Sequence, residues 1–295
     1  MEILEQFRAF YKRNYPDDME KAIELFSIFG RRDVVLDVTQ DIDALIYTHI
    51  LQNFTLHQEY IETLLHHNIH AKRLLYAFSR GDRKIFSAFK KARLNNQNGG
   101  VALGFLQQEG IVRIEYSREE DKRLIKPKLK REEAKHRISD KFLITDAFVR
   151  FWFFFIYPFE KEISKGDYEN FFSAFHKEFP RYISLVFEEL SGVLLDYYLQ
   201  DEELESVGSY WDANVEIDVY IVTKKGSIYV AECKWTNHKI NKKELNKLLE
   251  KTQQLRISPS KIVLFSKRGF SKELLRLADK NLLLFSVEDF KILVR

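Results

Sequence analysis

Apolar residues recur at helical spacing through the first 70 residues of the chain. The segments MEKAIELFSIF (19–29) and DIDALIYTHILQNF (41–54) place apolar side chains at i, i+3 and i+4, which predicts amphipathic helices. Between them, RRDVVLDV (31–38) is compatible with a short strand or a loop, because periodicity alone does not separate the two. We therefore predict a helical N-terminal region at 1–70.

The pattern changes between residues 71 and 158. Short apolar-periodic segments predict helices at 71–81, 82–94 and 101–110, while NNQNGG (95–100) predicts a turn. Strand-like IVRIEYS (111–117) is followed by a charged stretch and then by a second strand-like segment. This order of elements is typical of a winged helix-turn-helix domain, which we predict for 71–158.

The last third of the chain alternates between strand and helix patterns. One long amphipathic helix is predicted at 182–200, and ELESVGSY, VEIDVYIV and SIYVAECKW follow it as three strands. A helix, a strand, a helix and a strand complete the segment, which is the pattern of an α/β sheet covered by helices. We predict an α/β domain at 183–295, a helical connection at 159–182, and an α+β protein overall.

The central strands of this domain read as a β-hairpin. Lys224, Lys225 and Gly226 form a three-residue loop, in which glycine supplies the left-handed backbone conformation. If Thr223 lies opposite Ser227, the numbers of paired residues sum to 450. Asp218 then lies across from Glu232 and Glu216 across from Lys234, and Cys233 points to the other face.

Two opposed carboxylates repel each other, and burying them is costly unless a positive charge lies between them. Mg²⁺ satisfies this need, because proteins bind it through one or two carboxylates together with water and phosphate. Lys234 points to the same face, and Glu189 on the preceding helix completes the metal site, with Glu188 as its substitute. The alternative is a merely charged hairpin, in which Lys234 pairs with Glu216 and the two acids lie in water.

Asp218 followed by Glu232-Cys233-Lys234 on the next strand resembles the signature of the PD-(D/E)XK nuclease superfamily, and Glu189 matches its upstream acidic position. FEELSG, VGSYWDANVEIDVYI and VAECKW resemble, more narrowly, a C-terminal domain of unknown function in archaeal-type AAA+ ATPases, as does RISDKFLITDAFVRFWFFFIYPF. The resemblance covers residues 40–295. Ile217 replaces the superfamily's proline, and the chain contains no Walker A motif, so it is not the ATPase itself.

The resemblance implies a restriction-endonuclease-like αβββαβ core. By analogy, Asp218 and Glu232 hold Mg²⁺ or Mn²⁺ with help from Glu189, and Lys234 is the catalytic lysine. Gln253, or Gln254 beside it, matches a helix position that contacts DNA or water in related nucleases.

Basic and amide side chains in the winged-helix region are candidates for nucleic-acid contacts. They lie on the second predicted helix, the third helix and the charged stretch, which also contains five acidic residues that dilute its charge. The third helix offers only two glutamines for base edges, which favours non-specific DNA contact or protein contact over sequence recognition. The candidates are Arg83, Lys90, Lys91, Arg93, Gln107, Lys126, Lys128 and Lys130.

Composition narrows the class of protein. A length of 295 residues suggests two domains, and 45% hydrophobic residues are enough for folded cores. The net charge of +3 does not by itself indicate a nucleic-acid binder, and a single cysteine fits a reducing, cytoplasmic setting. The most apolar stretch, 148–159, is shorter than the roughly 20 residues of a membrane span, so we expect buried core or an interface and no membrane partner.

These observations favour a Mg²⁺-dependent nuclease that hydrolyses phosphodiester bonds in DNA. The alternative is a non-catalytic DNA-binding or regulatory module that retains the nuclease fold and docks on a separate ATPase or another protein. A sequence-specific transcription factor is a third hypothesis, which the apolar recognition helix disfavours.

Overall fold

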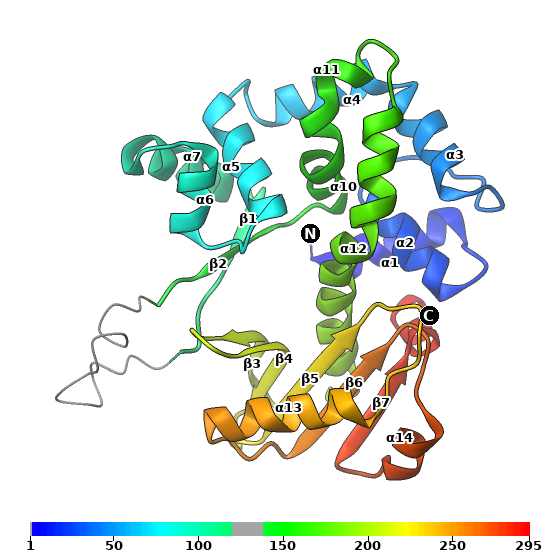
Figure 1. The fold of residues 1–295 in the computed structure, drawn as a ribbon, viewed down its shortest axis with the longest axis vertical. Coiled ribbons are helices and arrows are strands. Elements are labelled where there is room, and N and C mark those ends of the chain that lie inside the picture. The colour runs from blue at the N-terminus through cyan, green and yellow to red at the C-terminus, as the bar shows by residue number, and fades with distance from the viewer. Residues whose placement is uncertain (1, 120–137) are drawn as a thin grey trace. The chain divides into compact units, whose positions relative to one another are not determined.

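The computed structural model describes residues 2–119 and 138–295, and the chain divides into two compact units. The first unit holds residues 2–115 and 141–186, and the second holds 116–119, 138–140 and 187–293. The predicted α+β class is confirmed, since the N-terminal half is helical and the C-terminal part carries a mixed sheet (Figure 1).

Two helices of the N-terminal region begin at aspartate caps, and the region packs through aromatic side chains. Asp18 and Asp41 each accept a hydrogen bond from the backbone N–H three residues later, which satisfies donors that the first helical turn leaves open. Phe7 packs edge-on against Phe26, with ring centroids 5.1 Å apart. Residues 31–38 form no strand. The elements are α1 (Ile3–Asn14), α2 (Met19–Phe29), α3 (Ile42–Ile46), the π-helical turn η1 (Tyr47–Leu51) and α4 (Phe54–Leu64).

Three helices and an antiparallel strand pair follow, in the predicted order. The turn predicted at 95–100 is wrong, because Asn95 accepts a hydrogen bond from the Asn98 N–H at 2.8 Å and caps a helix that begins at Asn96. Gly99 is required in that helix, since a Cβ there would lie 2.7 Å from the Phe89 ring. The elements are α5 (Ile69–Arg80), α6 (Ile85–Ala92), α7 (Asn96–Gln108), β1 (Val112–Glu115) and β2 (Lys141–Ile144).

The aromatic run at 148–159 forms core, as predicted. Trp152 is fully buried and stacks on Phe54 at 5.7 Å between ring centroids. The Tyr182 hydroxyl donates to the carbonyl of Ser27 at 2.6 Å. In the described ranges, no helix has both the length and the apolar character needed to cross a membrane. The elements are α10 (Ala147–Phe151), the π-helical turn η2 (Trp152–Ile156), the 3-10 turn η3 (Tyr157–Phe159) and α11 (Glu160–Ile163).

Helix α12 (Glu169–Tyr198) begins 13 residues before the predicted start at residue 182 and continues through Pro180. A five-stranded sheet follows in the order β3-β4-β5-β6-β7, antiparallel from β3 to β5 and parallel from β5 to β7. The order α12-β3-β4-β5-α13-β6 confirms the predicted αβββαβ sequence of elements. The remaining bounds are β3 (Leu204–Trp211), β4 (Glu216–Thr223), β5 (Ile228–Lys234), α13 (Lys242–Leu255), β6 (Lys261–Ser266), α14 (Lys272–Leu277), β7 (Leu282–Ser286) and the 3-10 helix η4 (Val287–Val294).

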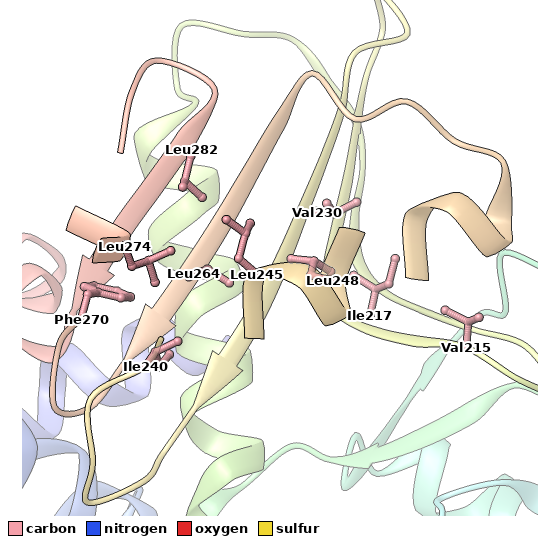
Figure 2. Packing of buried hydrophobic residues seen from close by; sticks show 10 residues of the cluster. All are labelled: Val215, Ile217, Val230, Ile240, Leu245, Leu248, Leu264, Phe270, Leu274 and Leu282. Carbon is pink, nitrogen blue, oxygen red and sulfur yellow. The ribbon is translucent and has the colours of Figure 1, made fainter. Parts of the chain in front are cut away.

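The two faces of this sheet carry different helices. On one face, Leu245 and Leu248 of α13 pack with Val230 and Leu264 in a buried cluster (Figure 2). On the other face, Phe187 of α12 contacts the Trp235 ring at 5.0 Å. Alternating residues of β5 therefore point to opposite helices, which assigns Glu232 and Lys234 to the α13 face.

Candidate functional site

The hairpin between β4 and β5 has the predicted register. Its paired residues run from Val222 opposite Ile228 to Val219 opposite Ala231, and every pair sums to 450. Gly226 adopts φ +79°, the left-handed conformation that the three-residue loop requires. The observed pairing ends at Val219 and Ala231, one pair before Asp218 and Glu232.

A β-bulge in β4 lies between Ile217 and Tyr220, in the stretch that contains Asp218. On β3, the step from Gly208 to Tyr210 spans two residues, whereas the paired step on β4, from Tyr220 to Ile217, spans three. The extra residue interrupts the alternation of side chains between Ile217 and Tyr220, and bulges of this kind re-aim a side chain. Asp218 Oδ2 accepts a hydrogen bond of 2.8 Å from the backbone N–H of Cys233 on β5. The carboxylate thereby accepts a hydrogen bond from a backbone N–H of β5 just beyond the last residue pair of the β4–β5 hairpin.

Glu232 is the buried centre of the site, with only 6% of its surface exposed. Its two carboxylate oxygens contact different lysines: Lys234 Nζ lies 2.6 Å from Oε1, and Lys251 Nζ lies 2.6 Å from Oε2. Lys234 also lies 3.9 Å from Glu244, which in turn pairs with Lys247 at 2.7 Å. A chain of five alternating charges therefore runs across β5 and α13.

The electrostatics of the site follow from this crowding. Burial and the neighbouring charge of Glu232 raise the pKa of Asp218 from 3.8 to about 7. Burial alone would lower the pKa of Lys234, but its hydrogen bond to Glu232 and the charge of that carboxylate raise it. Two carboxylates and two ammonium groups thus lie close together with little exposure to water. The lysines supply the positive charge that two neighbouring buried carboxylates need.

The predicted pairing of Lys234 with Glu216 is replaced by contacts to Glu232 and Glu244. Glu216 lies opposite Trp211 of β3 instead. The alternative of two acids lying in water is also wrong for Glu232, which is buried.

Glu189 and Glu188 lie on α12 and are half-buried. The charge of Glu188, with that of Asp218, contributes to a raised pKa of the Cys233 thiol, whose main cause is burial. Within residues 2–119 and 138–295, no group of three or more His, Cys, Asp or Glu side chains is arranged to hold a metal ion. The charge of Glu232 acts on Asp218, so these two residues form the acidic pair of the site, and Glu189 stays a predicted third ligand.

Lys251 is the residue of this site that sequence reasoning missed. In the sequence it belongs to a basic stripe of Lys243, Lys247 and Lys251, whose spacing is equally typical of an exposed helix face. In the structure, Leu248 is buried one turn earlier, and this orientation of α13 brings Lys251 to Glu232. Residues three apart lie on the same face of a helix, so the position of Lys251 three residues after Leu248 is the sequence signal for such a contact.

The predicted nucleic-acid residues lie on several separate elements. Lys126, Lys128 and Lys130 fall outside the described residues. Lys90, Lys91 and Arg93 are exposed at the end of α6, where Lys91 donates to the carbonyl of Arg80 at 2.8 Å. The other candidates are Arg83, half-buried before α6, Gln107, exposed on α7, and Gln253 and Gln254, exposed at the end of α13.

Residues 152–248 match the model of a family of archaeal and bacterial proteins of unknown function, DUF234. A comparison with curated proteins finds no match. Among solved structures, the chain is similar at 13% sequence identity and a TM-score of 0.30 to the protein VC1899 from Vibrio cholerae. That alignment covers 78% of this chain and 55% of the Vibrio protein, and so low a TM-score carries no argument about the fold. The segment similar to the family of unknown function contains Glu189, Asp218, Glu232 and Lys234.

Proposed function

We propose that the protein is a Mg²⁺-dependent phosphodiester hydrolase that acts on DNA. The observation that carries the proposal is the electrostatic interaction of two carboxylates, Asp218 and the buried Glu232, beside the ammonium group of Lys234. A like-charge pair of this kind costs stability, as the raised pKa of Asp218 indicates. Such costs are concentrated at functional sites.

The acidic pair fits a hard divalent cation. Mg²⁺ is commonly bound through one or two carboxylates and completes its coordination with water and substrate phosphate. Asp218 and Glu232 would hold the ion, with Glu189 as the predicted third ligand, and Mn²⁺ takes the same oxygen donors. A bound ion of this type lowers the pKa of a coordinated water and neutralises phosphate charge.

The remaining residues have roles that follow from their charge and position. Lys234 would orient the attacking water and offset the negative charge that develops on the phosphate. Lys251, on the other side of Glu232, would offer a second positive charge to the DNA backbone. Basic side chains at the end of α6 would add phosphate contacts that do not depend on base sequence.

The resemblance to the PD-(D/E)XK superfamily supports this proposal. The observed element order and the positions of Asp218, Glu232 and Lys234 on adjacent antiparallel strands agree with what that resemblance implies. The matched family of unknown function adds no activity of its own.

A second candidate is a non-catalytic DNA-binding or regulatory module, associated with a separate ATPase. The specific observation in its favour is that Glu232 already has two ammonium partners, Lys234 and Lys251. The site then balances its charge without a metal ion. In that case the acids and lysines hold α13 on the sheet, and substitution changes stability or DNA affinity only.

Calorimetric titration of Mg²⁺ and Mn²⁺ into the full chain, with and without DNA, separates the two candidates. For the nuclease, we expect binding that Asp218→Ala abolishes and that Glu205→Gln, an exposed carboxylate on β3, leaves unchanged. Cleavage of duplex and single-stranded DNA should then need Mg²⁺ and be lost in Lys234→Met, while circular dichroism shows the fold intact. Absence of metal binding in the unmodified protein, even with DNA, supports the non-catalytic module.

A further inference from the structure

A cavity of about 200 Å³ lies within the first unit, whereas the acidic pair belongs to the second. It is bounded by the C-terminal end of α2 and the residues that follow it, the π-helical turn η1, α4 and α10. An apolar cavity of roughly 150 Å³ holds one benzene molecule. The cavity therefore has room for a single ring with a small substituent.

Four of the ten residues that line the cavity carry rings. Phe29 meets His49 edge-on with ring centroids 6.2 Å apart, and His57 contacts Phe148 at 5.2 Å. Burial lowers the pKa of both histidines, so their rings are neutral at neutral pH. Four uncharged rings around one space favour an aromatic guest, because ring edges and faces pack against each other.

Arg32 brings a positive charge to this wall. Its guanidinium lies over the Tyr60 ring at 4.2 Å and over the Phe148 ring at 5.1 Å. Arg32 forms no salt bridge with any residue that the structure describes, and the carboxylate of Asp146 lies 3.9 Å from the neighbouring Arg31. A planar guanidinium that lies over two rings and has no carboxylate partner is suited to a planar or phosphate anion.

Asp33 also lines the cavity, but its charge is compensated. Its carboxylate pairs with Arg13 at 2.8 Å, and Arg13 donates a second hydrogen bond to the backbone carbonyl of Arg32 at 3.1 Å. The same contacts fix the loop that carries Arg32.

His57 supplies an unused hydrogen-bond acceptor. Its Nε2 lies 2.8 Å from the carbonyl oxygen of His49, and because a carbonyl only accepts, Nε2 carries the proton in the neutral ring. Nδ1 then keeps a lone pair, which is buried and has no hydrogen-bond partner, in a residue only 7% exposed. A buried acceptor without a donor is rare, and Nδ1 has less than 1 Å² of accessible surface in this structure. A hydroxyl or N–H of a bound molecule would therefore satisfy it after the imidazole turns toward the cavity.

We propose that this cavity is a binding site for a small aromatic anion, whose carboxylate or phosphate group contacts Arg32 and whose ring lies among Phe29, His49, His57 and Phe148. A hydroxyl group on the ring donates to His57 Nδ1. The site is independent of the acidic pair and of the proposed hydrolysis.

The test uses 4-hydroxybenzoate and phenyl phosphate as probes, with 4-hydroxybenzamide as the uncharged match of the first. Binding to the full chain is measured by saturation-transfer NMR and calorimetry. A ligand of this size is expected to bind with a Kd on the order of 1 mM or tighter. Tighter binding of the benzoate assigns the anion as a carboxylate, and tighter binding of phenyl phosphate assigns it as a phosphate.

Two variants locate the binding. Arg32→Gln should weaken affinity about tenfold or more, whereas Arg31→Gln, the adjacent control outside the cavity lining, should leave it unchanged. Leu56, which lines the cavity and is 60% exposed, is replaced in Leu56→Trp to fill the space while Arg32 stays in place. Binding that survives Leu56→Trp, binding of the amide equal to that of the benzoate, or no binding of either anion would overturn the proposal.

Discussion

Asp218→Asn tests directly whether ionisation of Asp218 beside Glu232 lowers the stability of the folded protein. The substitution keeps the size of the side chain and an oxygen that accepts from the Cys233 N–H, and it removes only the ionisable group. Because burial and Glu232 raise the pKa of Asp218 to about 7 from its usual 3.8, the folded protein binds the proton more tightly than the unfolded chain does. The stability from this protonation is fully present below about pH 4 and is lost as the pH rises through about 7.

The size of the effect follows from the two pKa values. At about 1.4 kcal/mol per pH unit between them, ionising Asp218 costs the folded state up to about 4 kcal/mol above pH 7. Most of the change, about 2 to 3 kcal/mol, falls between pH 5 and pH 8. Asp218→Asn escapes this cost, so its stability relative to the unmodified protein should rise by that amount over the same interval.

Urea unfolding followed by tryptophan fluorescence measures this difference at each pH. Trp211 and Trp235 both lie in the second unit and are buried, so their emission responds to loss of the sheet. Glu205→Gln, which removes an exposed strand carboxylate, serves as the control and should show no such trend. Parallel pH profiles for Asp218→Asn and the unmodified protein would refute the argument that Asp218 ionises against the charge of Glu232.

Three further perturbations test the packing around the site. Leu248→Ala removes a fully buried side chain between α13 and the sheet and should lower the free energy of unfolding in urea by about 2 to 5 kcal/mol. Glu250→Ala, at an exposed position of the same helix, should lower it little, and equal losses would contradict the assigned helix face. Gly226→Val should cost about 1 to 2 kcal/mol because valine is strained at φ +79°, and an unchanged thermal midpoint would argue against the three-residue hairpin loop. Lys251→Met frees one oxygen of Glu232 from a competing cation and should tighten Mg²⁺ binding in calorimetry; weaker binding would mean that Lys251 helps to build the site.

The hairpin register was predictable because it depends on local rules. A glycine in a three-residue loop sets the pairing, and the period of two then places Glu232 and Lys234 on one face. The bulge in β4 was not predictable, because it depends on how β4 pairs with β3, whose register no local signal specifies. The proximity of the two acids was therefore anticipated, but the end of the ladder before Asp218 was not.

Features that depend on tertiary packing were not predictable from the sequence. NNQNGG contains strong turn residues, but asparagine is equally favourable as a helix cap, and contact of Gly99 with Phe89 decides for the helix. The partner of Lys251 depends on the rotation of α13 about its axis, which buried Leu248 fixes. The cavity beside Arg32 is formed by four segments, and none of them carries a recognisable motif.

The position of Asp218 depends on the bulge in β4, whereas the hydrophobic core of the sheet does not. The buried cluster that joins α13 to the sheet includes Ile217, Val230 and Leu264 but not Asp218. Deleting Val219 would make the steps between Ile217 and Tyr220 equal on β3 and β4 and would turn Asp218 to the opposite face, away from Glu232. A lineage carrying this domain can thus lose or regain the acidic pair through a single-residue length change, and proteins with the same sheet need not share the same chemistry.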